Sequence, residues 1–229
     1  LASVPLGPAL EGIGPQCGRM AGPGSITRFE VSPLGLACHS VDGPLAAGAD
    51  VQGISATGYL SLLALLLRLG CLDADGHFRT PASPLARRVA PPPQQARTGL
   101  RLPLPYGQWL AAADVEELLK VKAAFSQALE ALLRAAGLAA ADVACLAPAG
   151  ALGEHCPPAC LEELGFLPSG MGRRVRAVGN SSLDGAALLA AEPWRLPALA
   201  RWCAAATLVP VAEDPGFHAD YLRHMRFGV

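Results

Sequence analysis

The sequence has no surplus of basic residues and no hydrophobic run long enough to cross a membrane. It contains 18 Lys and Arg residues and 19 Asp and Glu residues, and charged residues make up 16% of the chain. Such a balance leaves no excess charge to neutralise the phosphates of a nucleic acid. The longest apolar stretch, residues 59–67, is about half of the roughly 20 residues that a membrane-spanning helix needs. We therefore expect neither a nucleic-acid partner nor a membrane partner.

Two features of secreted proteins are also missing. The first residues do not show the basic and then apolar order of a secretory signal. The seven cysteines are an odd number without regular spacing, which argues against a disulfide framework. Cys156 and Cys160 lie beside His155, but Cys-x3-Cys is not a usual zinc or iron–sulfur spacing. We predict buried or half-buried free thiols at these two positions, and a cytoplasmic location.

Enough apolar sequence is present for a large core, since 52% of the 229 residues are hydrophobic. Residues 1–58 are rich in Gly and Pro, and short apolar stretches such as residues 26–31 predict strands joined by tight turns. Residues 58–70 then show helical periodicity that ends at Gly70, and residues 73–76 predict a turn.

A segment rich in Pro and Arg follows, over residues 80–105. Its prolines cannot continue a helix or a central strand, which favours an exposed linker. Leu100, Leu102 and Leu104 alternate as in a strand, which favours an ordered hairpin insert instead. We therefore divide the chain into residues 1–79, an insert or linker at 80–106, and residues 107–229.

The clearest helix is predicted over residues 114–136, with Asp114 as its N-cap and Gly137 as its stop. Lys122 falls on the apolar face of this helix, which should be buried. One interpretation is a side chain at the edge of the stripe whose ammonium reaches solvent. The other is a lysine directed at a carboxylate or a phosphate.

Two segments predict a strand, a small-residue turn and a helix in succession. Residues 143–153, VACLAPAGALG, form the first. The second has a strand at 174–178, a turn at 179–182 and a helix through 186–191. Turns of this kind also occur wherever backbones pack closely. If both lie at the same end of one parallel sheet, they mark the usual place of a ligand crevice.

Two further helices are predicted. One is short, over residues 158–164. The other is an amphipathic helix over residues 214–227, with Asp214 as its cap and Pro215 at its first position.

Several segments, in order along the chain, resemble motifs of the reductive activators of corrinoid proteins. GPALEG at 7–12 and QCGRMAGPGSI at 16–26 are similar to the family's Gly-Pro-Ala-Phe-Glu-Gly and Cys-Gly-Met-Arg-Ala-x-Pro-Gly-Ala-Ile runs. GISATGYLSLLALLLRLGCLDADGHF at 53–78 resembles its Gly-Ile-Cys-Gly-Ser-Gly helix. The remaining matches are Asp114, Val115, Lys122, AGALG at 149–153, GFLP at 165–168, VGNSSLDGA at 178–186 and DPGFHADYLRHMRF at 214–227.

This resemblance implies an α/β fold, a ribonuclease-H-like lobe of the sugar kinase, heat-shock chaperone and actin ATPase superfamily, with a mixed sheet and flanking helices. It implies the C-terminal part of a longer iron–sulfur protein that uses ATP and Mg²⁺. Such proteins help deliver a low-potential electron from an iron–sulfur cluster, held elsewhere in the polypeptide, to a corrinoid protein or corrinoid-dependent methyltransferase. A homodimer is also implied.

The resemblance assigns two groups of residues to the nucleotide. On the adenosine side it places the turn of Gly150, Ala151 and Gly153, together with Gly179 and Asn180 of the following Gly-Asn turn. Small residues there let the backbone lie against a base or a ribose.

On the other side the resemblance places Lys122, Glu11, Gly53 and Gly58. Glu11 either orients a metal-bound phosphate or water, or is a turn residue that bonds nearby backbone amides. The two glycines either admit phosphate at a helix start or allow close helix packing.

Departures from the family pattern limit what the resemblance implies. Ala56 replaces the middle glycine of Gly-Ile-Cys-Gly-Ser-Gly, Leu152 replaces a phenylalanine, and Pro148 interrupts the strand before the adenosine loop. The paired Asp-Ile-Gly-Thr phosphate loops of the superfamily are absent from the sequence. We therefore predict no catalytic residue and little or no ATP hydrolysis by this chain alone. The alternative function is a degenerate lobe that serves as a dimerisation and docking module.

Overall fold

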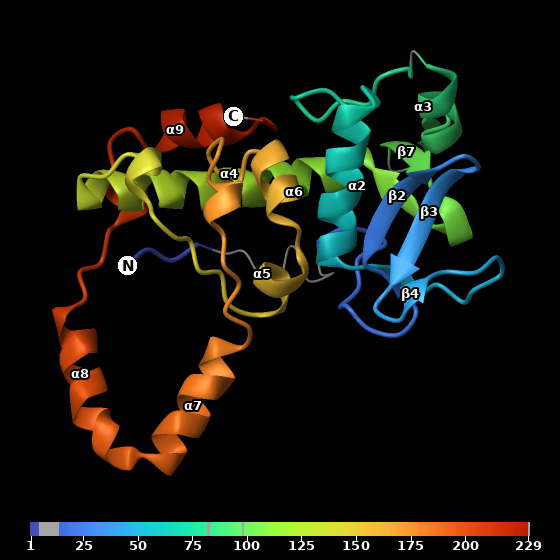
Figure 1. The fold of residues 1–229 in the computed structure, drawn as a ribbon. Helices are drawn as coiled ribbons and strands as arrows, with labels where there is room; N and C mark the ends of the chain where they lie inside the picture. Colours follow the sequence, from blue (N-terminus) through green and yellow to red (C-terminus); the bar gives the residue numbers. More distant parts are fainter. Residues whose placement is uncertain (5–13, 82, 98, 229) are drawn as a thin grey trace.

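The fold has a strand-rich part around helix α2 and a helical part around helix α4 (Figure 1). The computed structural model describes residues 1–4, 14–81, 83–97 and 99–228. Helix α2 spans Ala56–Arg68 and α4 spans Ala112–Ala136. A core shared by both parts joins them, with Leu63 of α2 and Leu118 of α4 among its buried members. The α/β class and the flanking helices are as predicted.

The strands form three small sheets that together contain both parallel and antiparallel pairs. Strand β1 (Ser25–Ile26) pairs in parallel with β5 (Gly53–Ile54). Strands β2 (Arg28–Ser32), β3 (Gly35–Ser40) and β4 (Gly43–Pro44) form an antiparallel sheet. The strand predicted over residues 26–31 is thus divided between two sheets.

Helix α2 begins two residues before the predicted start at residue 58 and ends close to the predicted stop. Its N-cap is Ser55, whose hydroxyl accepts a hydrogen bond from the amide of Gly58 at 3.2 Å. The helix ends before Gly70, which adopts a left-handed φ of +65°. The hydroxyl of Ser61, in the middle of the helix, accepts a hydrogen bond from the amide of Phe29 at 3.0 Å, which connects α2 to β2.

The described residues of the segment rich in Pro and Arg form helix and strand structure. It contains helix α3 (Pro84–Val89), capped by Ser83, and strands β6 (Gln94–Ala96) and β7 (Gly99–Pro103). After the turn η1 (Pro105–Gly107), strand β8 (Trp109–Ala111) completes an antiparallel sheet. Leu102 and Leu104 are buried. The hairpin alternative for this segment is therefore confirmed.

Helix α4 begins differently from the prediction. Its N-cap is Ala111, and Asp114 is the third residue of the helix rather than its cap. The Asp114 carboxylate reaches back to accept the amide of Ala111 at 2.9 Å and also that of Gln16 at 2.9 Å. An acidic side chain at this position satisfies free amides of the helix start as a cap would. The predicted stop at Gly137 is confirmed, with φ +66°.

The strands predicted within residues 143–153 and at 174–178 do not form as regular strands in these described segments. The two segments share one parallel bridge, Leu146 with Val175. Pro148 has no amide to donate to a ladder, and the turns η2 (Ala140–Asp142) and η3 (Gly172–Arg174) occupy neighbouring residues. Helices α6 (Pro158–Glu163) and α7 (Ser181–Ala191) follow as expected, with α7 starting five residues earlier, whereas α5 (Ala151–His155) lies where a turn was predicted.

The C-terminal helix is shorter than predicted. After η5 (Val211–Glu213), helix α9 covers Phe217–His224, and its N-cap is Gly216 rather than Asp214. The Asp214 carboxylate accepts the Gly216 amide at 2.8 Å and so closes a turn ahead of the helix. Helix α9 lies along α4, and Gln127 donates to the carbonyl of Phe217 at 2.7 Å.

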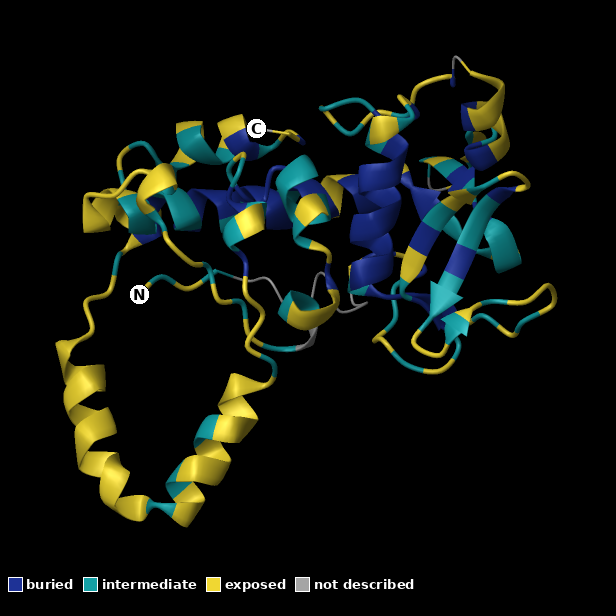
Figure 2. Cartoon of the chain, in the orientation of Figure 1, coloured by how far each residue is buried: buried dark blue, intermediate teal, exposed yellow. Residues whose placement is uncertain are grey.

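One part of the chain leaves the body of the molecule. Helix α7, the turn η4 (Pro193–Arg195) and helix α8 (Leu196–Ala205) project together as an arm (Figure 1). Colouring by burial shows no buried residue along it (Figure 2). Among all helices that the structure describes, none combines the length and hydrophobicity needed to cross a membrane.

Candidate nucleotide site

The two glycine turns predicted from the sequence lie side by side. The amide of Arg176 donates to the carbonyl of Leu146 at 2.8 Å, and the amide of Val178 to that of Pro148 at 3.0 Å. At the end of these paired segments, the amide of Gly150 donates to the carbonyl of Gly179 at 2.8 Å. The expectation that both turns meet at one end of parallel segments is confirmed, although the segments are not regular strands.

Both turn glycines have backbone angles that favour glycine. Gly150 has φ +84° and ψ 172°, a region that is essentially restricted to glycine, and Gly179 has φ +65°. A Cβ placed on either residue would meet no atom within 4 Å. The backbone is thus open to an approaching ligand at both turns.

Two neighbouring residues start the helices that leave these turns. Ala151 is the first residue of α5. Asn180 is the N-cap of α7, and its side-chain oxygen accepts the amide of Leu183 at 3.1 Å. The amide side chain of Asn180 therefore holds the turn at the start of α7.

The other predicted glycines are in crowded positions. A Cβ on Gly153 would lie 2.6 Å from Cβ of Pro148, so glycine lets α5 fold back onto that residue. A Cβ on Gly53 would lie 2.8 Å from the carbonyl oxygen of Cys17, and one on Gly58 would lie 2.8 Å from Cγ2 of Ile54. Close packing accounts for glycine at all three positions. Because α2 contacts α5, the start of α2 still lies on the side of the Gly150 turn (Figure 1).

Lys122 is fully buried, so its ammonium does not reach solvent at the edge of the helix. Two partners of its Nζ are main-chain carbonyls at the end of α9, of His224 at 3.1 Å and of Arg226 at 2.7 Å. Burial, and secondarily the charge of Arg223, lowers the pKa of Lys122 to about 8. These contacts attach the C-terminal segment to α4.

The lowered pKa of Lys122 predicts a pH-dependent stability. Between about pH 8 and 10.5 the unfolded chain keeps a proton that the folded chain has lost, so the free energy of unfolding should rise with pH in this window. In Lys122→Met this contribution is absent. Urea unfolding of both proteins at pH 7.5, 9 and 10 checks it. We expect the stability of the wild type relative to the variant to increase with pH, and a constant difference would contradict the assignment.

Glu11 and the GPALEG motif lie outside the described residues. The structure therefore places Gly150, Ala151, Gly179 and Asn180 together, and sets Lys122 apart on α4 beside α9.

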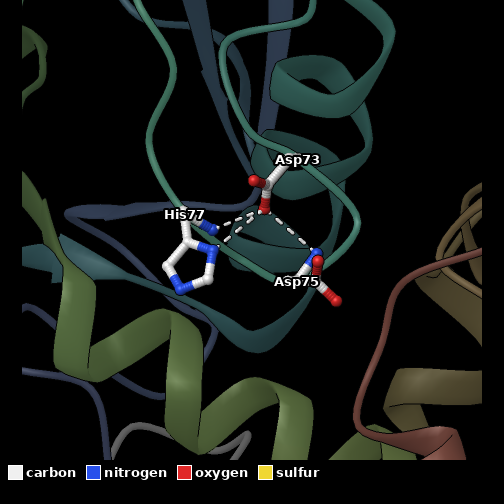
Figure 3. Close-up of side chains that lie close together, drawn as sticks. All are labelled: Asp73, Asp75 and His77. Atoms are coloured by element: carbon white, nitrogen blue, oxygen red, sulfur yellow. Dashed lines mark hydrogen bonds and ion pairs between the residues drawn. The ribbon is translucent and has the colours of Figure 1, made fainter.

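A group of metal-capable side chains that the sequence analysis did not select lies in the turn after α2. Asp73, Asp75 and His77 can each offer a ligand atom within 4.8 Å of the others (Figure 3). However, one oxygen of Asp73 accepts the amides of Asp75 at 3.0 Å and His77 at 2.8 Å, and the other accepts from Arg79 at 2.8 Å. Partial burial raises the pKa of the Asp73 carboxyl, but these hydrogen bonds and the nearby positive charges outweigh that effect and lower the pKa. The cluster is explained as a closed turn.

The cysteines are free thiols, as predicted. Cys156 is buried and Cys160 half-buried, and burial raises the pKa of Cys156 to about 12. A thiol with such a pKa stays protonated and unreactive at neutral pH.

Buried His224 and half-buried Glu130, a pair that the sequence analysis also missed, border a cavity of 380 Å³ beside α4. Nε2 of His224 lies 2.8 Å from a carboxylate oxygen of Glu130. Burial lowers the pKa of His224, although the hydrogen bond to Glu130 raises it in part. Since the two residues are 94 positions apart, only the packing of α9 on α4 brings them together.

Comparisons with known proteins agree with the fold. A family model described as the C-terminal domain of RACo, the ASKHA domain, matches residues 1–228. The corrinoid activation enzyme RamQ of Eubacterium limosum is 27% identical over 237 residues, covering 100% of this chain and 39% of RamQ. The solved structure of a reductive activator for corrinoid, iron-sulfur protein matches with a TM-score of 0.83 and 23% identity, over 99% of this chain and 36% of that one. The chain thus spans about two fifths of these relatives.

Proposed function

Because the chain belongs to the family of C-terminal ASKHA domains of RACo, an actin-like ATPase fold, we propose that it is the ATP-binding part of a longer reductive activator. In that protein it would help transfer a low-potential electron from an iron–sulfur cluster to a corrinoid protein. The family match over nearly the whole chain supports this function, and so does the likeness to an enzyme named for corrinoid activation.

The meeting of the Gly150 and Gly179 turns is the observation that carries the nucleotide part of the proposal. The two glycines expose main chain to solvent, and Asn180 fixes the second turn. An open backbone surface of this kind fits the flat face of an adenine or a ribose, because no Cβ stands in the way. Gly150, Ala151, Gly179 and Asn180 would hold the adenosine, with Gly153 supporting the loop. Gly53 and Gly58 would act through packing.

ATP with Mg²⁺ would supply binding energy that changes a conformational equilibrium, since electron transfer itself needs no phosphoryl acceptor. Lys122 would act indirectly by fixing the C-terminal segment, and Glu11 remains the candidate for the magnesium side. The resemblance assigns the cluster to another part of the longer protein. It also supports a corrinoid protein or corrinoid-dependent methyltransferase as partner, a homodimer and a cytoplasmic location.

Calorimetric titration of ATP with Mg²⁺ into the full-length protein tests the nucleotide site. Gly150→Val should weaken binding by about tenfold or more, because a branched side chain blocks the open backbone and cannot adopt φ +84° without strain. Gly22→Val is the matched control, since Gly22 also has open space around a Cβ but an ordinary φ. It should bind ATP like the wild type.

Two results would count against this proposal. Absence of binding by the wild type would remove the nucleotide from the function. Binding unaffected by Gly150→Val, with the variant folded by circular dichroism, would place the adenosine elsewhere.

The arm supports the alternative function of a docking module. Its exposed apolar helices, and the replacement of a family glycine by Ala56, are what a lobe that has lost nucleotide binding would show. The titration above separates the two functions, because a docking module needs no ATP.

A further inference from the structure

The cavity of 380 Å³ lies between the second half of α4, the end of α9 and the turn at residues 165–168. Most of its wall is apolar, and Leu133 of α4 and Phe166 of the turn are among the side chains that line it. None of the described lining residues belongs to the Gly150 turn or the Gly179 turn. The cavity is therefore separate from the proposed nucleotide site.

The volume of this cavity limits the size of a molecule that could occupy it. Pockets for small molecules measure about 300–1,000 Å³ and are mostly apolar, with a few polar groups. Two turns of an α-helix about 10 Å wide would need on the order of 800 Å³, which exceeds the 380 Å³ of the cavity. A small molecule therefore fits this space better than a helix of another protein.

One carboxylate on the cavity wall is fixed in orientation and keeps a free oxygen. Arg223 and Nε2 of His224 both donate to the same oxygen of Glu130, Oε2, each at 2.8 Å. The other oxygen, Oε1, has no hydrogen-bond partner within the residues that the structure describes, and it is not buried. Glu130 thus offers one accessible acceptor beside an apolar surface.

The burial of His224 indicates that this residue positions Glu130. Its side chain is 8% exposed, and its Nδ1 is buried without a hydrogen-bond partner in the described part of the chain. A buried acceptor without a donor is unfavourable, so the ring is held through Nε2 at Glu130. Burial raises the pKa of Glu130, but the hydrogen bonds from Arg223 and His224 outweigh this and lower the pKa. At neutral pH Glu130 is therefore a carboxylate, which can only accept hydrogen bonds.

The other charged side chains that line the cavity also have partners. Arg134 pairs with Asp214 at 3.2 Å, and the carboxylate of Glu162 accepts the amide of Gly170 at 2.7 Å. Since Glu130 is paired as well, a charged ligand would find no unpaired opposite charge among the described lining residues. A neutral molecule would lose least on leaving water for this cavity.

We propose that the cavity binds a small neutral molecule with an apolar body and one hydrogen-bond donor, such as a hydroxyl or an N–H group. The apolar body would pack against Leu133 and Phe166, and the donor would bond to Oε1 of Glu130. Arg223 and His224 would act as positioning residues that hold the carboxylate. This ligand is additional to the nucleotide of the proposed function and does not depend on it.

Calorimetric titration of two probes of the same shape into the full-length protein tests the site. Indole carries an N–H donor, and benzofuran has an oxygen in its place. We expect indole to bind with a dissociation constant on the order of 100 μM. It should bind about tenfold more tightly than benzofuran, which is the effect of one hydrogen bond. No binding of indole up to about 1 mM, or equal affinities of the two probes, would overturn the inference.

Two variants separate the acceptor from the cavity. Glu130→Met removes Oε1 and should abolish the preference for indole over benzofuran. Leu133→Trp fills the cavity and should weaken the binding of both probes at least about tenfold. The matched controls are Glu116→Met on the same helix and Leu222→Trp on α9, because both positions are exposed and neither lines the cavity. Both controls should bind the probes like the wild type.

Two results with variants that are folded by circular dichroism would count against the site. A Glu130→Met protein that keeps the tenfold preference for indole would reject the role of the carboxylate. Unchanged binding by Leu133→Trp would place the probes elsewhere and reject the cavity. If Glu130→Met does not fold, the comparison of the two probes on the wild type and on Leu133→Trp still decides. The titrations contain no ATP, so a failure here and a failure of the nucleotide test are separate results.

Discussion

Lys122→Ala is expected to lower the free energy of unfolding by about 3–5 kcal/mol. The change leaves the carbonyls of His224 and Arg226 without a buried donor, and it opens a cavity along α4 where the aliphatic part of the lysine packed. In a domain of this size such a loss corresponds to a fall in Tm of about 10 °C or more. Urea unfolding followed by circular dichroism measures it.

The matched control is on the same helix. Lys120 lies two residues earlier, keeps 42% of its side chain accessible to solvent, and pairs with Glu116 at 3.0 Å and with Glu117 at 2.9 Å. Lys120→Ala should cost less than about 1 kcal/mol. Equal effects of the two substitutions would show that the carbonyl bonds of Lys122 contribute little. A stable Lys122→Met protein that no longer binds ATP would instead favour a ligand role for this lysine.

The helices of this fold could be predicted wherever their signals are local. Gly70 ends α2 and Gly137 ends α4 as predicted, whereas the N-cap of α2, Ser55, was not predicted. The prediction of strands within residues 143–153 and at 174–178 was wrong, because it gave too little weight to Pro148 and did not foresee the turns η2 and η3; the two segments share one bridge. The meeting of Gly150 and Gly179 was nonetheless predicted, since parallel segments bring their ends to one edge.

Features that depend on distant parts of the chain could not be predicted. The periodicity of α4 placed Lys122 on the buried face, but its carbonyl partners are 102 and 104 residues away. The pairing of Glu130 with His224 has the same origin. The sequence also predicted a helix at 186–191 without showing that it projects from the rest of the molecule. The apolar sequence of a helix does not show which surface, if any, packs against it.

Gly58→Ala is expected to destabilise the protein by about 3 kcal/mol, against the intrinsic preference of the helix. Alanine favours a helix over glycine by roughly 1 kcal/mol, so an uncrowded site would gain stability. Here the new Cβ would press on the carbonyl oxygen of Ile26 and lie 2.8 Å from Cγ2 of Ile54. Both neighbours belong to the parallel pair β1–β5, and α2 would have to move away from it.

The sign of the change in unfolding free energy shows whether glycine is needed at the start of α2 for packing or for another reason. Thermal and urea unfolding of Gly58→Ala should show the loss, while Gly22→Ala, with no atom within 4 Å of its Cβ and an ordinary φ, should stay close to the wild type. A Gly58→Ala protein as stable as the wild type but defective in ATP binding would favour the phosphate role. A destabilised protein that still binds ATP at low temperature would show that Gly58 serves the contact between α2 and its strands, and that the adenosine turns carry the recognition.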